Sequence, residues 1–535
     1  MKSRSLILYA LALIVFIGVA IAAGNAQSAP IVRHDIYHDT SLPVREYATF
    51  PVASQEAGAW LDEANRPFHA EHPRPVRKQW RGPMAVGADV AEEVSSLSTV
   101  SAVLGSNFEG IPNIANGTLV GIPPDPNLSV GATQVVEVIN SAYEVFDKAS
   151  GQSFFPPQQI STIFSGMPGL CGQGVTFFFT DPIVVYDKIA GRWVIGIVAY
   201  DNTGSHGNEC IAVSATSDAT GRYYRYAFKF GANTFPDYPK LAVWPDGYYA
   251  SYNLFTPTNV YGTACAYDRA RMLVGKSTAV VCFENASEFS YLPSDLDGAT
   301  LPPAGEPNFF IDLFDTSSLH LYRFHADFKS PADSVFFGPL TIAVKPFTPA
   351  CGGGACIPQL GTSQQLDTLS DRLMFRLAYR NFGSHESLVV NHSVQTSVAD
   401  SGVRWYEIRR PDDNPRVYQQ GTFTDGDRSA WMASIAMDKA GDIGLGFSES
   451  NSSMHPAIAY TGRMPADPPN QMELPATIYA GNGSQTGADR WGDYSGLAID
   501  PVDDCTFWYV NEYYAVDNGY KFRTRIASFK FPECK

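Results

Sequence analysis

The sequence predicts an all-β fold, a β-propeller of seven four-stranded blades that follows an extended N-terminal leader. The first observation is a repeated phrase: a polar residue, a short apolar run, a turn built on Asp or Gly, and a second aromatic-rich run. It is clearest at 181–201 and again at 493–511. Such repetition along a chain is typical of radial β architectures.

The second and third observations are the composition and length of the segment 117–535. Aromatic and β-branched residues are punctuated there by Gly, Asn, Asp and Pro, which favours strands over helices. The segment has room for seven units of roughly 55 to 60 residues, within the four to eight blades that propellers use. One unit, around Asn308, fits less well than the others, so six to eight blades stay open.

The repeated phrase also places the strands of each unit. The first strands align at 127–130, 183–186, 240–244, 366–369, 434–437 and 496–499, and the second strands at 135–139, 193–197, 248–252, 373–377, 443–447 and 507–510.

Residues 1–28 have the layout of a secretory signal peptide. A charged start is followed by an apolar run over 6–23 and then by small residues. The alternative is a membrane anchor, because a run of this length just spans a bilayer. We expect cleavage, a secreted or periplasmic location and no further membrane span. Residues 29–116 are then an extended leader that packs on the main domain or stays partly mobile, or a pro-segment.

Charge and cysteine content narrow the partners and the compartment. The 38 Lys and Arg against 54 Asp and Glu give a formal charge of -16. This balance argues against nucleic acid, which needs a basic footprint. Disulfides are expected in an exported chain, and the absence of Cys-x-x-Cys spacing argues against a zinc or redox centre. Chain order suggests, among 105 pairings, the bonds Cys171 with Cys210, Cys265 with Cys282, Cys351 with Cys356, and Cys505 with Cys534.

Propeller geometry sorts the polar residues. Loops that lead into first strands share one face with loops that leave second strands, so their residues converge on one mouth of the axis. The residues before the predicted first strands are Asp125, Asp181, Asp237, Asn308, Gln364, Trp431 and Asp493, with Arg428 and Arg490 nearby. The residues after the second strands include Asn140, Asp201, Asn253, Arg380, Asn381, Glu449, Asn511 and Glu512.

A mouth rich in acids, amides, arginines and aromatics suits a glycan. Paired carboxylates serve as acid and base, or as nucleophile, in glycoside hydrolysis. We therefore predict a catalytic set of His385, Glu386, Asp493, Asp181 and Asp237. The predicted substrate-binding set is Arg380, Asn381, Arg428, Trp431, Arg490, Trp491, Asn511 and Glu512. The alternative for each Asp is a structural cap that bonds backbone N–H groups.

Two local clusters are the sharpest parts of this prediction. In the loop 379–386, His385 beside Glu386 suits a general base, and Arg380 suits an anionic sugar group. The alternative is an ordinary hydrogen-bonded loop. In 489–494, an exposed Trp491 would stack on a sugar, whereas a buried one would pack between blades.

No cofactor is expected, and no metal ligand is assigned. The four aspartates Asp125, Asp181, Asp237 and Asp493 could hold a structural Ca²⁺ through carboxylate oxygens near the axis.

The runs 490–514 and 235–241 resemble a largely uncharacterised group of secreted bacterial propeller-like proteins. At the level of fold the chain is also similar to sialidase-type propellers. It lacks the Ser-x-Asp-x-Gly-x-Thr-Trp box of that family, so the resemblance does not extend to sialidase activity. Two functions stay open. One is a secreted propeller that binds an extracellular polysaccharide at the axial mouth, with cleavage by a hydrolase or lyase mechanism undecided. The other is a non-catalytic extracellular scaffold that binds a protein.

Overall fold

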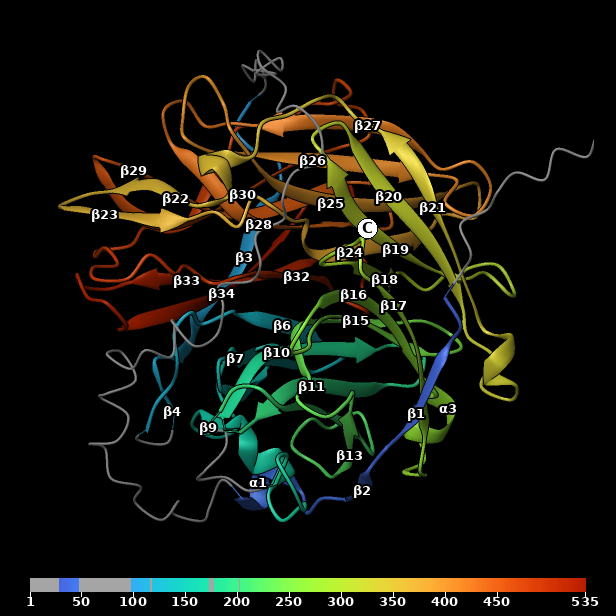
Figure 1. Cartoon of the computed structure of the whole chain (residues 1–535). Helices are drawn as coiled ribbons and strands as arrows, with labels where there is room; N and C mark the ends of the chain where they lie inside the picture. The colour runs from blue at the N-terminus through green and yellow to red at the C-terminus, as the bar shows by residue number, and fades with distance from the viewer. Residues whose placement is uncertain (1–27, 48–97, 116–117, 173–177, 202) are drawn as a thin grey trace, which may run out of the picture.

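The protein is an all-β propeller, shown as a computed structural model in Figure 1. The structure describes residues 28–47, 98–115, 118–172, 178–201 and 203–535. The predicted signal peptide, apart from residue 28, lies outside these residues, as does the middle of the predicted leader. No helix in the described part of the chain is both long and apolar enough to span a bilayer.

Each unit is an antiparallel sheet built outward from a first strand, because consecutive apolar runs are joined by tight turns. The first sheet contains β6 (Asn127–Val130), β7 (Gln134–Ile139), β8 (Ala142–Asp147) and β9 (Gln158–Gln159). The second contains β10 (Phe178–Asp187), β11 (Arg192–Tyr200), β12 (Gly207–Ser214) and β13 (Tyr223–Lys229). The third contains β14 (Phe235–Val243), β15 (Tyr248–Phe255), β16 (Val260–Tyr267) and β17 (Ala279–Asn285).

The next two units share one eight-stranded sheet, because β18 runs parallel to β24 and joins them. The sheet contains β18 (Leu292–Asp297), β19 (Asn308–Asp315), β20 (Ser318–His325), β21 (Val335–Ala343), β24 (Met374–Asn381), β25 (Glu386–Val394), β26 (Gly402–Arg409) and β27 (Arg416–Phe423). The following sheet contains β28 (Ser429–Met437), β29 (Ile443–Asn451), β30 (Met454–Arg463) and β31 (Ala476–Tyr479).

The last sheet is completed by an N-terminal strand. It contains β32 (Gly496–Ile499), β33 (Phe507–Tyr514), β34 (Phe522–Lys530) and β3 (Val103–Pro112). The first strands then form a closed ring in the order β6, β10, β14, β18, β24, β28, β32 and back to β6. The blade number of seven stays a prediction, since two of the units merge into one sheet through β18.

The described ends of the leader pack on the propeller. β1 (Ile31–His34) pairs with β17, and β2 (Tyr37–Thr40) pairs with β13, so each adds a fifth strand to a blade. β3 precedes the predicted domain start at residue 117 and yet belongs to the closing sheet. The leader was predicted either to pack on the main domain or to stay partly mobile. Its strands β1, β2 and β3 are packed.

Short elements lie outside the blades. They are the helices α1 (Val44–Tyr47) and α3 (Arg269–Met272), the 3₁₀ turns η1 (Ile160–Phe164), η2 (Pro331–Asp333) and η3 (Ala350–Gly353), and the hairpins β4 (Ile114–Ala115) with β5 (Thr118–Leu119) and β22 (Ala355–Gln359) with β23 (Thr362–Asp367).

The β22–β23 hairpin explains two errors in the predicted phase. Residues 366–369 were predicted as a first strand and 373–377 as a second, but β24 is itself a first strand, and the hairpin is an insertion before it. The unit around Asn308 is also shifted, because β18 is its first strand and β19 its second. The inserted hairpin has the same β-rich sequence pattern as a blade strand. The pattern therefore predicted a blade strand where the hairpin lies.

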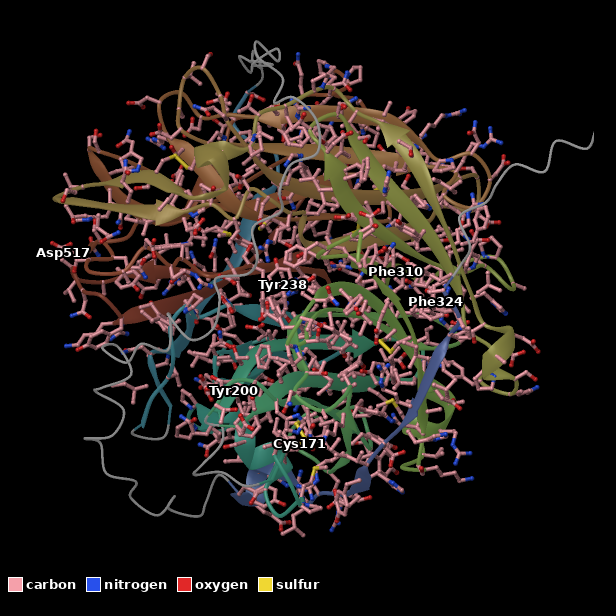
Figure 2. All side chains as sticks on the ribbon, viewed as in Figure 1. Cys171, Tyr200, Tyr238, Phe310, Phe324 and Asp517 are labelled. Carbon is pink, nitrogen blue, oxygen red and sulfur yellow. A yellow bond between two sulfur atoms is a disulfide. The ribbon has the colours of Figure 1, made fainter. Side chains whose placement is uncertain are left out.

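The core lies between adjacent sheets and is rich in aromatic rings. Phe310 and Phe324 are part of its largest cluster and lie 5.9 Å apart between ring centroids (Figure 2). Four disulfides are present with the predicted pairing: Cys171–Cys210, Cys265–Cys282, Cys351–Cys356 and Cys505–Cys534.

Candidate functional site

Two of the axial aspartates, Asp181 and Asp237, are presented by bulges at the start of the first strands. In β10 the register shifts between Thr180 and Ile183, and in β14 between Asp237 and Lys240. Asp181 and Tyr238 at these bulges have left-handed backbones, each with φ of 55°. A bulge bends its strand and redirects side chains, so the local sequence at each Asp turns polar groups toward the axis.

Hydrogen bonds connect these bulges from blade to blade. Asp125 Oδ1 accepts the Asp493 backbone N–H at 2.6 Å, and its Oδ2 accepts Asn140 Nδ2 at 2.8 Å. Asn140 Oδ1 accepts the Asp181 N–H at 2.7 Å, and Asp181 Oδ2 accepts the Tyr238 N–H at 2.9 Å. The capping alternative is therefore confirmed for Asp125 and Asp181, although each caps a neighbouring blade.

Cations and aromatic rings complete the axial cluster. Lys240 is fully buried, with Nζ 3.4 Å from the centroid of the Tyr238 ring and 4.1 Å from that of Tyr494. Arg372 pairs with Asp371 and stands 4.7 Å over the Tyr238 ring. Tyr238 lies near the centre of the molecule in Figure 2. A cation over an aromatic face is stabilised where water is excluded, so the rings help to hold these charges.

Burial and mutual repulsion alter the acid–base properties of the cluster. Burial, reinforced by Asp493 and Asp181, raises the pKa of Asp125 well above its usual value. Burial and the neighbouring Asp181 raise the pKa of Asp237 to about 8. Burial lowers the pKa of Lys240 to about 7, against the effect of the carboxylates around it. Asp237 is therefore a protonated acid at neutral pH.

Asp237 is the least buried acid of the cluster. It is partly exposed, whereas Asp125, Asp181 and Asp493 are buried. Among the described residues, its carboxyl group accepts no side-chain or backbone hydrogen bond. Asp493 differs, because Arg490 donates from Nη2 to its Oδ1 at 2.6 Å. The predicted catalytic residues Asp181, Asp237 and Asp493 are thus brought together, but they are not equally available.

A polar hollow lies next to Arg490, because the preceding residue, Asp489, is part of its wall. It has a volume of about 420 Å³ and is lined by Ala355, Thr362, Ser363, Gln364, Gln365, Gly487 and Asp489. The β22–β23 hairpin supplies most of this wall, and the Asp367 N–H donates to the Asp489 carbonyl at 2.8 Å. Gln364 therefore reaches the predicted mouth from the inserted hairpin and not from a blade strand. Arg490 follows Asp489 and connects the hollow with the acids.

The two indoles predicted to bind substrate are core residues. Trp431 and Trp491 are 0% and 1% exposed, and their ring centroids lie 5.7 Å apart. Trp491 also donates from Nε1 to Ser448 Oγ at 3.0 Å. The prediction that they stack on a sugar is wrong, because packing between blades buries their faces.

Asn511 and Glu512 are likewise buried. Asn511 Nδ2 donates to Ser448 Oγ at 2.8 Å and to the Tyr509 hydroxyl at 2.7 Å. Glu512 accepts the Gly492 N–H, and burial raises its pKa well above the usual range. Glu512 positions the loop that carries Asp493, and burial closes both residues to substrate, which corrects the prediction that they bind it.

The loop 379–386 lies at the opposite end of the axis. Because β24 is a first strand, the loop to β25 is on the face of the first-to-second turns. Arg380 confirms this position, since Nη1 and Nη2 bind Asp504 at 2.9 and 2.7 Å in the β32–β33 turn. The structure therefore does not bring His385, Glu386, Arg380 and Asn381 together with the axial aspartates.

These four residues have local partners instead. Asn381 Nδ2 donates to the Leu301 carbonyl at 2.7 Å, and His385 stacks on Phe382 at 4.8 Å between centroids. Burial lowers the pKa of His385, aided by Arg409. Tyr379 donates its hydroxyl to Glu386. The segment 379–386 is therefore a hydrogen-bonded loop, as the alternative prediction stated.

Arg428 remains near the predicted mouth, but it is engaged by acids of its own blade. Nη1 lies 3.1 Å from Asp425 and 3.5 Å from Glu449. Its side chain is 43% exposed, so it is the one arginine of the predicted set that solvent reaches freely.

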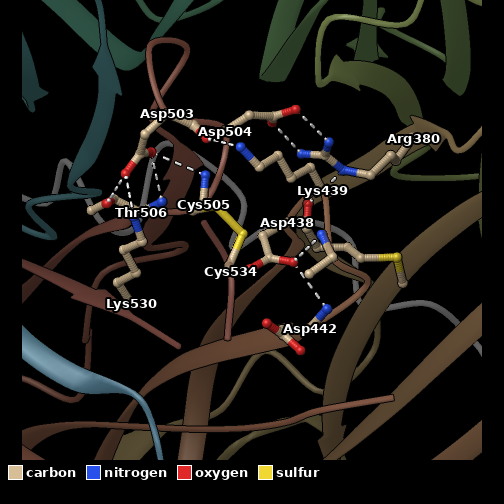
Figure 3. Close-up of a disulfide and its surroundings, with 12 residues drawn as sticks. Arg380, Asp438, Lys439, Asp442, Asp503, Asp504, Cys505, Thr506, Lys530 and Cys534 are labelled. Atoms are coloured by element: carbon tan, nitrogen blue, oxygen red, sulfur yellow. Dashed lines mark hydrogen bonds and ion pairs between the residues drawn. A yellow bond between two sulfur atoms is a disulfide. The ribbon is translucent and has the colours of Figure 1, made fainter. Parts of the chain in front are cut away.

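The arrangement does not suit a metal ion. At the axis, Asp125 and Asp181 already accept backbone N–H groups, and Lys240, Arg372 and Arg490 compete with a cation for the carboxylates. A second grouping joins Asp438 to Cys505 and Cys534 (Figure 3). Its two sulfurs form a disulfide, so they offer no thiolate ligand.

Sequence reasoning missed three members of the cluster: Lys240, Tyr238 and Arg372. The first two stand in the run 235–241, where the alternating Pro residues mark the bulge. Arg372 was assigned to a turn on the other face, since the hairpin insertion had shifted the phase. Its position next to Asp371, just before an apolar run, is the same signal that marked the other aspartates.

Comparison with known proteins assigns this chain neither a family nor an activity. No family model matches the chain, and no curated protein matches it significantly. Among solved structures, the N-terminal domain of Nup159 covers 82% of this chain and 98% of its own, with 9% identity and a TM-score of 0.35. A PL25 ulvan lyase covers 79% and 95%, with 12% identity and a TM-score of 0.38.

A GH43 endo-arabinanase from Bacillus licheniformis covers 56% of this chain and 99% of its own, with 10% identity and a TM-score of 0.29. At such identities and TM-scores these likenesses carry no argument about fold, substrate or mechanism.

Proposed function

We propose that this protein is an exported propeller that binds an extracellular polysaccharide at the Asp237 end of the axis and cleaves it by acid–base chemistry. The observation that carries the proposal is the convergence of a protonated, partly exposed Asp237 with Asp493, Arg372 and Arg490 beside a polar hollow. Four disulfides support export, because such bonds persist in oxidising compartments.

The roles follow from protonation and access. Asp237, with a pKa of about 8, donates a proton to the oxygen of the leaving sugar. Asp493, oriented by Arg490, serves as the carboxylate partner, as base or nucleophile. Arg372 and Arg490 offset the negative charge of the carboxylates in the cluster. Hydroxyl and amide groups of the β22–β23 hairpin bind sugar hydroxyls. The same groups serve either hydrolysis or elimination. The products distinguish the two reactions, because elimination by a lyase forms an unsaturated sugar.

A non-catalytic scaffold is the second candidate, and a specific observation favours it. Asp125 and Asp181 connect neighbouring blades through backbone N–H groups, so part of the acidic ring is structural. In that function the axial charges fix the geometry of the ring, and a protein partner binds elsewhere on the surface.

The test compares an accessible acid with a capping acid of the same ring. Asp237→Asn and Asp181→Asn are prepared in the mature protein, with the exposed Asp333→Asn as control. Each is screened on a glycan array, for reducing-sugar release, and for the ultraviolet absorbance of the unsaturated sugar that a lyase forms. We expect Asp237→Asn to lower turnover about 100-fold, the size of a lost general acid, while glycan binding persists.

The pH profile gives a second readout. Because the carboxyl of Asp237 must be protonated to act, wild-type turnover should decline above about pH 8. Asp181→Asn should alter stability more than turnover. If no glycan is bound or cleaved by the wild type, the scaffold replaces this proposal; if Asp237→Asn leaves turnover unchanged, the axial acid is not the catalyst.

A further inference from the structure

A second polar hollow lies on the outer rim of the propeller, far along the sheets from the axial cluster. It has a volume of about 400 Å³ and lies between β21 and β27, the two outermost strands of the eight-stranded sheet. These strands are neighbours in Figure 1 and contact one another. Its lining, here called the rim groove, consists of Thr341, Ile342, Ala343, Lys345, Pro415, Arg416, Val417, Tyr418, Gln419, Gln420 and Asn470.

The rim groove exposes an aromatic ring, that of Tyr418, at a β-bulge. Glu407 pairs with Gln419 and Ile408 pairs with Val417, so Tyr418 is the extra residue of a bulge. Bulges redirect a side chain out of the regular alternation of a strand. Tyr418 is 56% exposed as a result. A large exposed ring held by irregular backbone is a typical platform for stacking against a ligand.

One face of this ring is supported by a fixed cation. The guanidinium carbon of Arg409 stands 3.3 Å from the centroid of the Tyr418 ring. Arg409 Nε donates to Glu407 at 2.6 Å, and Glu407 is buried. Glu407 also accepts Ser387 Oγ at 2.8 Å and Gln419 Nε2 at 2.6 Å. A carboxylate with three donors locks Arg409, so the ring is oriented before any ligand arrives.

The charge of the rim groove is opposite to that of the whole protein. Lys345 and Arg416 are exposed in it, and its lining contains no Asp or Glu, although the chain carries a formal charge of -16. Gln420 ties the two sides together, because its Oε1 accepts the Lys345 N–H at 2.9 Å and its N–H donates to Asn470 at 3.0 Å. Lys345 and Arg416 therefore lie in a groove whose two sides are joined by hydrogen bonds to the amide side chains of Gln420 and Asn470.

We infer that the rim groove is a binding site for an anionic polysaccharide, one that carries uronate or sulfate groups. Arginine and lysine bind carboxylate and sulfate oxygens, amides bind hydroxyls, and the open side of the Tyr418 ring stacks on a sugar ring. The hollow, of about 400 Å³, has the volume of a small-ligand site. This inference does not depend on catalysis at the axis.

The experiment measures binding of the full mature protein to four probes by calorimetry: polygalacturonate oligosaccharides, chondroitin sulfate oligosaccharides, neutral dextran and poly-glutamate. The variants are Lys345→Ala with Arg416→Ala, and Tyr418→Ala. The matched control is Arg222→Ala with Lys276→Ala, which removes the same charge from exposed positions on other blades. Asp237→Asn with Asp493→Asn disables the axial cluster and should leave binding at the rim groove intact.

We expect at least one of the anionic probes to bind, and neutral dextran not to bind. The Lys345 and Arg416 pair of substitutions should weaken the anionic binding about tenfold, or about 1.4 kcal/mol, and Tyr418→Ala about fivefold. Added salt should weaken binding of the wild type more than that of the charge variant. The control should stay within about twofold of the wild type.

The inference is overturned if neither anionic glycan binds, or if the wild type and the Lys345 and Arg416 variant bind equally. It is also overturned if poly-glutamate binds as tightly as the glycans. The last would assign the groove to an acidic peptide. Loss of anionic binding only in the axial variant would also overturn it, and would place the site at the axis.

Discussion

Asp438 and Asp442 bury two carboxyl groups against each other beside the Cys505–Cys534 disulfide (Figure 3). Asp438 Oδ1 accepts the N–H groups of Ala440 and Asp442 at 2.9 and 3.0 Å. Within the described residues, the Oδ2 atoms of both carboxyls are buried without a conventional donor. A proton shared between the two groups removes the repulsion that two buried carboxylates would otherwise have.

The pKa values of this pair give a stability prediction. Burial and Asp442 raise the pKa of Asp438 to about 8, while Arg463 on one side and Asp467 and Glu473 on the other face Asp442. The folded protein thus keeps a proton that the unfolded chain releases near pH 4. The stabilisation is complete below that pH and is lost as the pH rises through about 8.

We therefore expect the urea midpoint to fall between about pH 5 and pH 8.5, and Asp438→Asn to reduce that fall. The amide keeps the two N–H contacts and donates to Asp442. The exposed Asp333→Asn is the control and should follow the wild-type profile. Parallel profiles for the wild type and Asp438→Asn would show that the pair shares no proton.

Among the structural elements, two of the disulfides anchor segments that the sheets do not hold. Cys351–Cys356 closes a separation of 5 residues at the base of the β22–β23 hairpin, whereas Cys171–Cys210 closes 39 residues and joins the segment before β10 to β12. A cross-link restricts the unfolded chain more when the loop it closes is longer.

Removal of these bonds should therefore have unequal costs. We expect Cys171→Ala with Cys210→Ala to lower the free energy of unfolding by about 4 kcal/mol, and Cys351→Ala with Cys356→Ala by about 2 kcal/mol. Urea unfolding of both double variants measures the difference. Costs that are equal, or ranked the other way, would mean that local packing and not loop length decides the contribution.

At the scale of the whole molecule, one strand closes the ring. β3 pairs with β34, so the last sheet joins segments from both ends of the chain. Without β3, the edge of β34 would expose unpaired N–H and carbonyl groups, which destabilise a sheet and promote aggregation. β1 and β2 only extend blades that are otherwise complete.

Two truncations separate these contributions. A chain that starts at residue 98 loses β1 and β2, and we expect it to unfold cooperatively with a modestly lower Tm. A chain that starts at residue 118 also loses β3 and should aggregate or lose the cooperative transition. Thermal scans by circular dichroism compare the two. Similar Tm values would show that β3 is not needed for closure.

Sequence reasoning recovered the features that depend on local pattern. The alternation of apolar runs and turns marks most first and second strands, and Asp before Pro marks the positive-φ positions of Asp125 and Asp181. It failed where the inserted β22–β23 hairpin shifted the predicted assignment of first and second strands. Because each strand step reverses the face, a single misassigned strand moved His385 and Arg380 to the wrong end of the axis.

The amino-acid sequence alone predicted the β class and the convergence of Asp181, Asp237 and Asp493, since repeated units place equivalent residues at equivalent positions. Chain order only suggested the disulfide pairing, which the structure then confirmed. Only the tertiary structure decided which of these residues are accessible. Burial depends on contacts between distant segments, so Trp491 joined the core, Asp181 became a cap, and Asp237 stayed open as an acid. The rim groove has the same origin, because two strands far apart in the chain form its walls.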